Sequence, residues 1–521
     1  MRSLIQTFGA LALSALLLAP AQAEEIPRLA RQGDATQLLV DGKPFLILGG
    51  ELGNSTASSL PNLQRQWPTL KALNLNTVLA PVEWDQIEPV EGQFDFTVID
   101  GVIAQARASD MRLVLLWFGA WKNSMSTYTP TWVKRDGQSF PLARSAEGKV
   151  QEILSPSSPA TLAADARAFA ALMAHLKAID GDRRTVLMIQ IENEIGMLPS
   201  ARDHGPLAEA DFRKPVPTAV LKATGKTGSG NWEQVFGKSD ATDELWQAWT
   251  YGRFVEGLAS AGQKAYPLPM YVNAALNKPG LAPGGYPSAG PLPHLYEIWK
   301  VAAPSVFQAP DIYYPDFTHW AAQYDRPGNP LFVPEADRAG KVEAPANAFW
   351  TFGQHNAIGF SPFSIENVED PARNPLSGAY ALLRQLTPVI LNHQGKGTMR
   401  GFRPPVSFEG LVDEKPQTLT MGAWAVKVSF IDPWTPRDRQ IYAAHGGLLI
   451  QLSPDEFLVA GAGVTLTFGE GVGLEKVTEG RFEDGKWIEG RWLNGDETHQ
   501  GRHVRLEPGR FQTQRVKLYR Y

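Results

Sequence analysis

The stretch VLMIQIENEIGML, residues 186–198, decides the fold of this chain. A mostly apolar run leads directly into Glu192, Asn193 and Glu194. Ionised carboxylates are costly to bury unless they are paired or used. The segment therefore reads as a buried strand that ends either at the protein surface or in an active site.

Seven more runs of this kind occur along the first 370 residues: PFLILGG (44–50), NTVLAPVEW (76–84), MRLVLLWFGAW (111–121), PMYVNAAL (269–276), APDIYYPDF (309–317), PLFVPEA (330–336) and AIGFSPFSIEN (357–367). Continuous apolar runs are typical of strands that are buried on both faces. Helical patterns lie between several of them, most clearly from Pro159 to Asp180 with Ser158 as its cap. Eight β/α units predict a closed (β/α)8 TIM barrel. A doubly wound open sheet is the alternative, but the first strand is followed by no G-x-G-x-x-G turn.

The chain divides into three predicted parts. Residues 1–23 have the arginine, the apolar run and the small-residue site of a secretory signal peptide. Residues 24–384 form the predicted catalytic barrel. Residues 385–521 show short alternating strands separated by Gly, Pro and Asp, which predict a smaller β-sandwich-like domain. This domain either binds polysaccharide or packs against the barrel, and we favour packing.

Composition excludes several classes of partner. The net charge is −5 and no long basic run is present, so nucleic acid and anionic membrane surfaces are not expected to bind. After removal of the signal peptide no apolar run is long enough to span a membrane. The chain has no cysteine, which excludes disulfides and thiolate chemistry. Export without disulfides indicates a bacterial periplasm or exterior.

The reactive groups of such a barrel lie at the carboxyl ends of its strands. Strand 4 ends in Glu192-Asn193-Glu194, and strand 7 ends in Glu335, on the opposite side of the barrel mouth. Two facing carboxyl groups suit glycoside hydrolysis, in which one is protonated and the other is ionised. Periodicity does not choose between Glu192 and Glu194, because residues two apart on a regular strand point the same way.

Three segments resemble the family 35 glycoside hydrolases, which are β-galactosidases: QIENEIG (190–196), NTVLAPVEWDQIEPVEGQFDF (76–96) and PLFVPEA (330–336). The likeness covers roughly residues 45–367. It implies that Glu194 is the acid/base and Glu335 the nucleophile of a retaining exo-β-galactosidase. It also implies that Asn193 holds the sugar 2-hydroxyl.

The sequence departs from the family pattern near the site. Ile195 stands where the family pattern has a Tyr, and Ile87 stands where it has a His. The segment GAWKNSMSTYTPTW (119–132) replaces the AEWxxGG segment of that pattern. The sugar and its attachment therefore stay open, with galactose side chains of plant xyloglucan as one candidate substrate. The alternatives are a barrel glucosidase, mannosidase, arabinosidase or endo-hydrolase, or an inactive carbohydrate-binding barrel.

Further residues near strand ends are candidates for substrate binding: Tyr313 with Tyr314 in reserve, Trp121, Lys122, Asn123, Glu83 and Glu51. Each has a plain structural alternative, such as a core ring or a local ion pair. The nine histidines are scattered without an H-E-x-x-H motif, so we expect neither a metal nor another cofactor. The oligomeric state is left undetermined.

Overall fold

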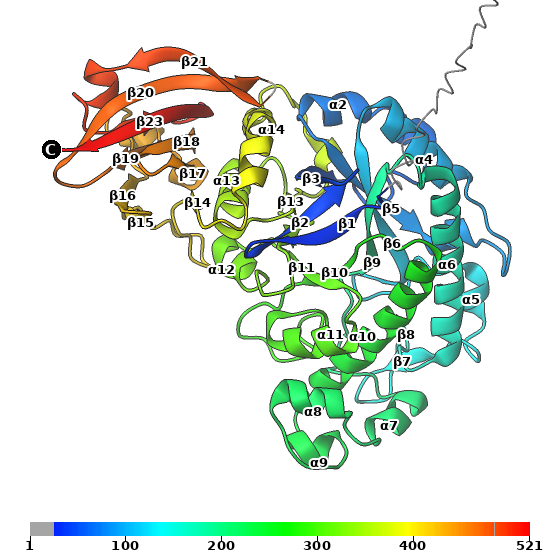
Figure 1. The fold of residues 1–521 in the computed structure, drawn as a ribbon. Coiled ribbons are helices and arrows are strands. Elements are labelled where there is room, and N and C mark those ends of the chain that lie inside the picture. The colour runs from blue at the N-terminus through cyan, green and yellow to red at the C-terminus, as the bar shows by residue number, and fades with distance from the viewer. Residues whose placement is uncertain (1–24, 484) are drawn as a thin grey trace, which may run out of the picture.

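The computed structural model describes residues 25–483 and 485–521, and the predicted signal peptide lies outside them. Its centre is an eight-stranded parallel sheet (Figure 1) with the strands in chain order around it. These strands are β4 (Ile47–Glu51), β5 (Thr77–Glu83), β6 (Arg112–Lys122), β9 (Val186–Asn193), β10 (Met270–Ala275), β11 (Phe307–Asp311), β12 (Phe332–Val333) and β13 (Gly359–Phe360). A parallel bridge between Asp311 and Glu335 joins the two ends of the sheet. The predicted TIM barrel is confirmed.

Helices lie on the outside of the barrel and connect its strands. They are α1 (Leu60–Gln64), α2 (Trp67–Ala72), α3 (Trp84–Ile87), α4 (Thr97–Ala108), α5 (Thr131–Arg135), α6 (Pro159–Asp180), α7 (Pro206–Phe212), α8 (Thr218–Thr224), α9 (Trp232–Phe236), α10 (Asp240–Ala265), α11 (Tyr296–Ala302), α12 (Phe317–Ala322), α13 (Ala344–His355) and α14 (Pro375–His393). Helix α6 begins as predicted, because the Ser158 side chain accepts a hydrogen bond from Thr161 N. None of the described helices is long and apolar enough to cross a membrane.

An antiparallel meander precedes the barrel: β1 (Arg28–Gln32), β2 (Ala35–Val40) and β3 (Lys43–Phe45). Leu38 and Val40 of β2 belong to the same buried cluster as Ile47, Val114 and Phe332 from inside the barrel. The meander therefore covers the end of the barrel at which the strands begin. A short hairpin, β7 (Leu142–Arg144) with β8 (Val150–Leu154), lies in the connection between β6 and α6.

Two antiparallel sheets form the C-terminal region. The six-stranded sheet has the order β14 (Met399–Phe402), β17 (Gly446–Ser453), β18 (Glu456–Ala462), β23 (Gln512–Arg520), β20 (Val472–Glu483), β21 (Lys486–Leu493). The four-stranded sheet has the order β15 (Gln417–Met421), β16 (Trp424–Ser429), β19 (Val464–Thr467), β22 (Val504–Leu506). Their facing side chains share one core, so the region is a sandwich.

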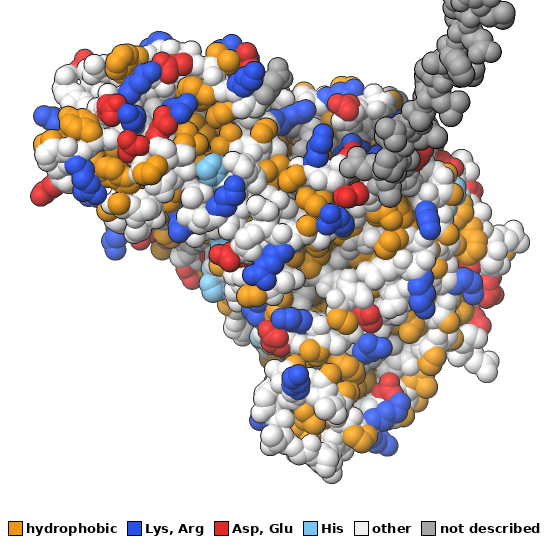
Figure 2. Space-filling model, in the orientation of Figure 1, with side chains coloured by type: hydrophobic (Ala, Val, Ile, Leu, Met, Phe, Trp, Pro, Cys, Tyr) orange, Lys and Arg blue, Asp and Glu red, His pale blue; other side chains and the backbone are white. Residues whose placement is uncertain are grey.

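The sandwich packs directly on the barrel. Leu448 and Ile450 of the six-stranded sheet lie in the same buried cluster as Phe349 and Phe352 of α13, and α13 and α14 stand between the two regions in Figure 1. The predicted boundary at residue 384 falls inside α14, because this helix continues to His393 before β14 starts at Met399. On the face shown in Figure 2, basic and acidic side chains are interspersed.

Candidate active site

The structure brings Glu194 and Glu335 together at the carboxyl end of the barrel strands. One carboxylate oxygen from each of Glu194, Asp311 and Glu335 lies within 4.8 Å of the others. Glu194 is 7% exposed and Glu335 is 3% exposed. The predicted proximity of these two acids, 141 residues apart in sequence, is thus confirmed.

Glu192 and Glu194 do not point the same way, as a regular strand would require. Both have positive φ angles, 58° and 46°, which lie in the left-handed region that residues other than glycine seldom adopt. The chain therefore departs from strand geometry at the end of β9. Glu194 turns toward the barrel mouth, while Glu192 turns away from it.

Glu192 lies on the side of the strand that faces away from the barrel mouth, where a second acid, Asp165, contacts it. Its oxygens accept from Trp121 N at 2.7 Å and from Ala120 N at 3.1 Å. Ala120 N also donates to Asp165 of α6 at 3.0 Å, and the Trp117 indole donates to the same carboxyl group at 2.8 Å. Burial raises the pKa of both acids, and their mutual contact requires a shared proton. This pair fixes the chain on which the mouth residues stand.

The residues on either side of the acid pair form a hydrogen-bonded set. Lys122 Nζ donates to Asn193 Oδ1 at 2.9 Å, and Asn193 Nδ2 lies 3.4 Å from Glu335 Oε1. The Asn123 amide donates to Glu194, and the Tyr313 hydroxyl donates to the second oxygen of Glu335. Four predicted binding residues, Asn193, Tyr313, Lys122 and Asn123, are therefore placed against the acids.

Two further residues, to which no motif in the sequence points, contact this set. Asn273 of β10 accepts from Glu194 N at 3.0 Å and donates to Asp311 Oδ2 at 2.6 Å. Asp311 ends β11, two residues before the predicted binding residue Tyr313. The apolar Phe307, which precedes the predicted run 309–317, is the signal for this strand end, because a strand that begins there ends at Asp311.

The surroundings give the acids different proton affinities. Burial, followed by the charge of Glu335, raises the pKa of Glu194 to about 7, while Lys122 opposes this effect. Burial and the charges of Glu335 and Glu194 also raise the pKa of Asp311 well above its ordinary range. Burial and Glu335 raise the pKa of the Tyr313 hydroxyl, so it stays a donor. A protonated Glu194 is therefore present near neutral pH.

Two predicted binding residues lie elsewhere. Trp121 is completely buried, donates to Leu154 O at 3.1 Å and packs edge-on against Tyr251 and Phe254. It is a core residue, because its indole faces α10. The reserve choice Tyr314 is half-buried, and its hydroxyl lies 3.3 Å from Leu276 O.

Glu83 keeps a local contact. Its carboxylate accepts from Gln86 Nε2 at 2.9 Å, and burial with the charge of Asp85 raises its pKa to about 7. No contact joins it to the acid cluster within the part of the chain that the structure describes. The local alternative is therefore the one that the structure favours.

The three clustered acids have the spacing of a metal site, the one such group found among the described residues. Asn123 and Tyr313 already donate to two of them, and the ammonium group of Lys122 supplies positive charge. These donors fit a cluster of carboxyl groups better than a metal centre. That no metal is required stays a prediction.

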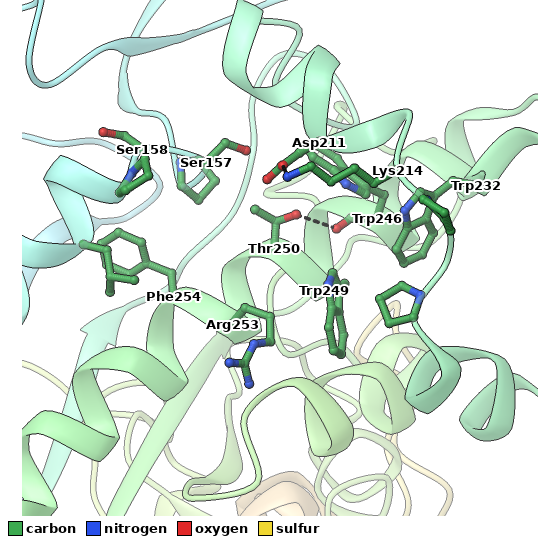
Figure 3. A pocket seen from close by; sticks show the side chains of 15 residues that line it. Ser157, Ser158, Asp211, Lys214, Trp232, Trp246, Trp249, Thr250, Arg253 and Phe254 are labelled. Atoms are coloured by element: carbon green, nitrogen blue, oxygen red, sulfur yellow. Dashed lines mark hydrogen bonds and ion pairs between the residues drawn. The ribbon is translucent and has the colours of Figure 1, made fainter. Parts of the chain in front are cut away.

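A cavity of about 420 Å³ lies on the outer wall of the barrel (Figure 3) between α6, α10 and the inserted helices. Its walls include Trp232, Trp246 and Trp249. Two of its charged residues, Asp211 and Lys214, pair with each other, and no member of the acid cluster lines it. The cavity is therefore separate from the candidate site.

Comparison with known proteins gives partial matches to β-galactosidases. Residues 61–222 match the family described as "Beta-galactosidase", glycoside hydrolase family 42. A β-galactosidase of Xanthomonas manihotis is 36% identical over 118 residues, which are 21% of this chain. The chain covers 19% of that relative's length. Residues 376–505 match a domain of unknown function, DUF5597.

Two solved structures that resemble this chain in part are distant from it in sequence. The catalytic domain of β-amylase from Paenibacillus polymyxa has a TM-score of 0.47 at 14% identity, over 63% of this chain and 94% of that one. A β-galactosidase from Marinomonas ef1 has a TM-score of 0.48 at 11% identity, over 66% of this chain and 60% of that one. Over residues 61–222 the barrel is similar to glycoside hydrolases of the β-galactosidase type, while membership of family 35 is not confirmed.

Proposed function

We propose that this protein is a retaining exo-β-galactosidase that releases terminal β-linked galactose. The observation that carries the proposal is the approach of Glu194 and Glu335, whose nearest carboxylate oxygens lie within 4.8 Å. Retaining glycosidases hold their two carboxyl groups about 5 to 5.5 Å apart, and inverting ones leave about 6.5 Å or more for a water molecule. The short separation favours a covalent intermediate.

In the first step an oxygen of Glu335 bonds to the anomeric carbon as the bond to the leaving oxygen breaks. The leaving oxygen takes the proton of Glu194, which the raised pKa keeps in place near neutral pH. In the second step Glu194 takes a proton from water. The water oxygen bonds to the anomeric carbon, and Glu335 leaves as a carboxylate.

The neighbouring donors suit these roles. The Tyr313 hydroxyl donates a hydrogen bond to Glu335 and so orients the nucleophile. Lys122 fixes the amide of Asn193, which then points its Nδ2 donor toward Glu335 and, on our proposal, toward the sugar 2-hydroxyl. Strengthening of that contact at the transition state lowers the barrier.

Two observations support exo action on galactose. The acids are almost fully buried, which suits a pocket for one terminal sugar better than an open groove. The matched family and the Xanthomonas manihotis relative are named as β-galactosidases. We keep side chains of xyloglucan as a candidate source of the galactose, and export to the periplasm or the exterior as the proposed location.

The test is hydrolysis of a panel of aryl β-glycosides by the wild type and by Glu335→Gly with and without azide. We expect turnover of the β-galactoside, loss in the variant, and recovery with azide to give α-galactosyl azide, because azide enters from the face that Glu335 occupied. Glu489→Gln, in an exposed ion pair of the sandwich, is the matched control and keeps wild-type turnover.

Each alternative has its own result in this panel. Preference for an aryl glucoside, mannoside or arabinoside would change the sugar but keep the mechanism. Wild-type turnover by Glu335→Gly would remove that residue from its role. Failure of the wild type to cleave any member of the panel, with oligosaccharides included, would favour an inactive carbohydrate-binding barrel.

A further inference from the structure

Glu51 is a buried acid of the barrel interior that the mechanism above does not use. It is the last residue of β4, and Ile47 on the same face of that strand belongs to the inner barrel cluster. Since side chains alternate along a strand, the Glu51 carboxyl group also points inward, at the end where the acids gather. Its backbone N–H donates to Pro362 O at 2.9 Å, which fixes this orientation.

The Glu51 carboxyl group lacks the contacts that a buried acid ordinarily has. The residue is 0% exposed, and neither oxygen has a hydrogen-bond partner within residues 25–483 and 485–521. A buried polar group without a partner costs several times the net gain of an ordinary hydrogen bond. A structural role alone does not account for such a group.

The charges that act on Glu51 belong to the candidate site. They come from Glu335, Lys122, Glu194 and Glu366. Glu366 is already engaged, since one of its oxygens accepts from Gly53 N at 2.9 Å and from the Thr56 hydroxyl. Glu51 therefore faces the acid pair and leaves its own oxygens available there.

We propose that Glu51 binds a hydroxyl group of the terminal sugar and is a specificity-determining residue of the site. This inference rests on the proposed glycosidase function. A sugar hydroxyl both donates and accepts, and it would give the orphaned oxygens of Glu51 the partner that the protein does not supply. Burial raises the pKa of Glu51 well above its ordinary range, so the group can donate as well as accept.

Asp311 supports a shared ligand at this place. Its Oδ1 has no hydrogen-bond partner among the residues that the structure describes, although the side chain is 2% exposed. Glu51 and Asp311 lie on different strands, and the charge of Glu51 contributes to raising the pKa of Asp311. Two neighbouring acids that each keep an oxygen without a partner fit a ligand with several hydroxyl groups.

The test pairs protein variants with substrates that lack single hydroxyls. Aryl β-galactoside and its 3-deoxy, 4-deoxy and 6-deoxy analogues are compared on the wild type, Glu51→Gln and Glu51→Ala. We expect Glu51→Ala to lower kcat/KM for the full galactoside by about 10- to 100-fold. For one deoxy analogue the variant and the wild type become equal, because the contact is already missing. Glu51→Gln keeps most of the activity, since an amide also donates and accepts.

The outcomes separate this inference from the function on which it rests. Equal losses on every analogue, or no loss at all, would overturn the role of Glu51 while leaving the glycosidase intact. A wild type that cleaves nothing in the panel would overturn both. Thermal unfolding of Glu51→Gln, with Glu489→Gln as control, verifies that the variant is folded. If the folded Glu51→Gln loses as much kcat/KM as Glu51→Ala on all analogues, this also counts against a hydroxyl contact.

Discussion

The proton of Glu194 gives the sharpest quantitative prediction. Burial and then the charge of Glu335 raise its pKa from 4.5 to about 7. At about 1.4 kcal/mol per pH unit, the difference is worth roughly 3 kcal/mol. Part of it belongs to Glu335 and disappears when that charge is removed.

The perturbation is Glu335→Gln, which keeps the shape of the side chain and removes its charge. Two unit charges 4.8 Å apart interact by about 3 kcal/mol at an effective dielectric constant of about 20. The carboxylate charges are spread over two oxygens, and Lys122 offsets part of the repulsion. We therefore expect the pKa of Glu194 to fall by roughly one to two pH units. Burial remains, so the pKa stays above 4.5.

The assay is a pH titration of ¹³C-labelled glutamate carboxyl groups by NMR, with Glu194→Gln used to assign the resonance. The kinetic counterpart is kcat/KM of the wild type, which falls as the pH rises through about 7 because Glu194 loses the proton that it must donate. An unchanged Glu194 resonance midpoint in Glu335→Gln would refute the coupling. A wild-type alkaline limb below pH 5.5 would refute the assignment of Glu194 as the acid.

Three further predictions concern the surrounding residues. Tyr313→Phe removes the hydroxyl on Glu335 and lowers kcat by about 10- to 100-fold with an unchanged melting temperature; an unchanged kcat would deny it a role. Glu192→Ala leaves the buried Trp121 N–H without an acceptor, while Ala120 N–H keeps Asp165, and it lowers the free energy of unfolding by about 1–3 kcal/mol in urea denaturation. Glu192→Gln loses less, and equal losses would contradict this account. In the native protein Glu194 holds a proton that the unfolded chain releases near pH 4.5. The stability that this group contributes is therefore lost as the pH rises from 4.5 to about 7. Between pH 5 and pH 8 the free energy of unfolding, measured by denaturation, should fall by roughly 3 kcal/mol more in the wild type than in Glu194→Gln.

The barrel could be predicted because its signal is local. Each of the eight runs is apolar and bounded by polar or turn residues, and each overlaps a strand in the structure. The meeting of acids from strands 4 and 7 follows from the rule that parallel strands end at one face of the barrel, whereas the choice of Glu194 over Glu192 rests on the resemblance to family 35. Neither inference required knowledge of side-chain contacts.

The errors lie where a contact between distant residues decides the outcome. Trp121 follows an apolar strand and reads as a mouth residue, but α10, more than a hundred residues later, supplies the rings that bury it. Asp311 stands shortly before two tyrosines in a run predicted to extend to Phe317, so the predicted strand end lay at Tyr313 and not at Asp311. Periodicity also does not separate Glu192 from Glu194, because the partner that holds Glu192 away from the barrel mouth is Asp165 of α6.

The end of β9 shows how one segment uses two identical acids for different purposes. Left-handed backbone at Glu192 and Glu194 costs of order 1–3 kcal/mol at each residue. Two backbone N–H groups and Asp165 hold the first acid in place and offset this cost. Because the first acid is held behind the strand, the second is directed into the mouth with Asn123 and Asn273 on either side. Strain at Glu192 is thus a condition for the chemistry of Glu194, and loosening the Asp165 pair should misplace the proton donor before it unfolds the barrel.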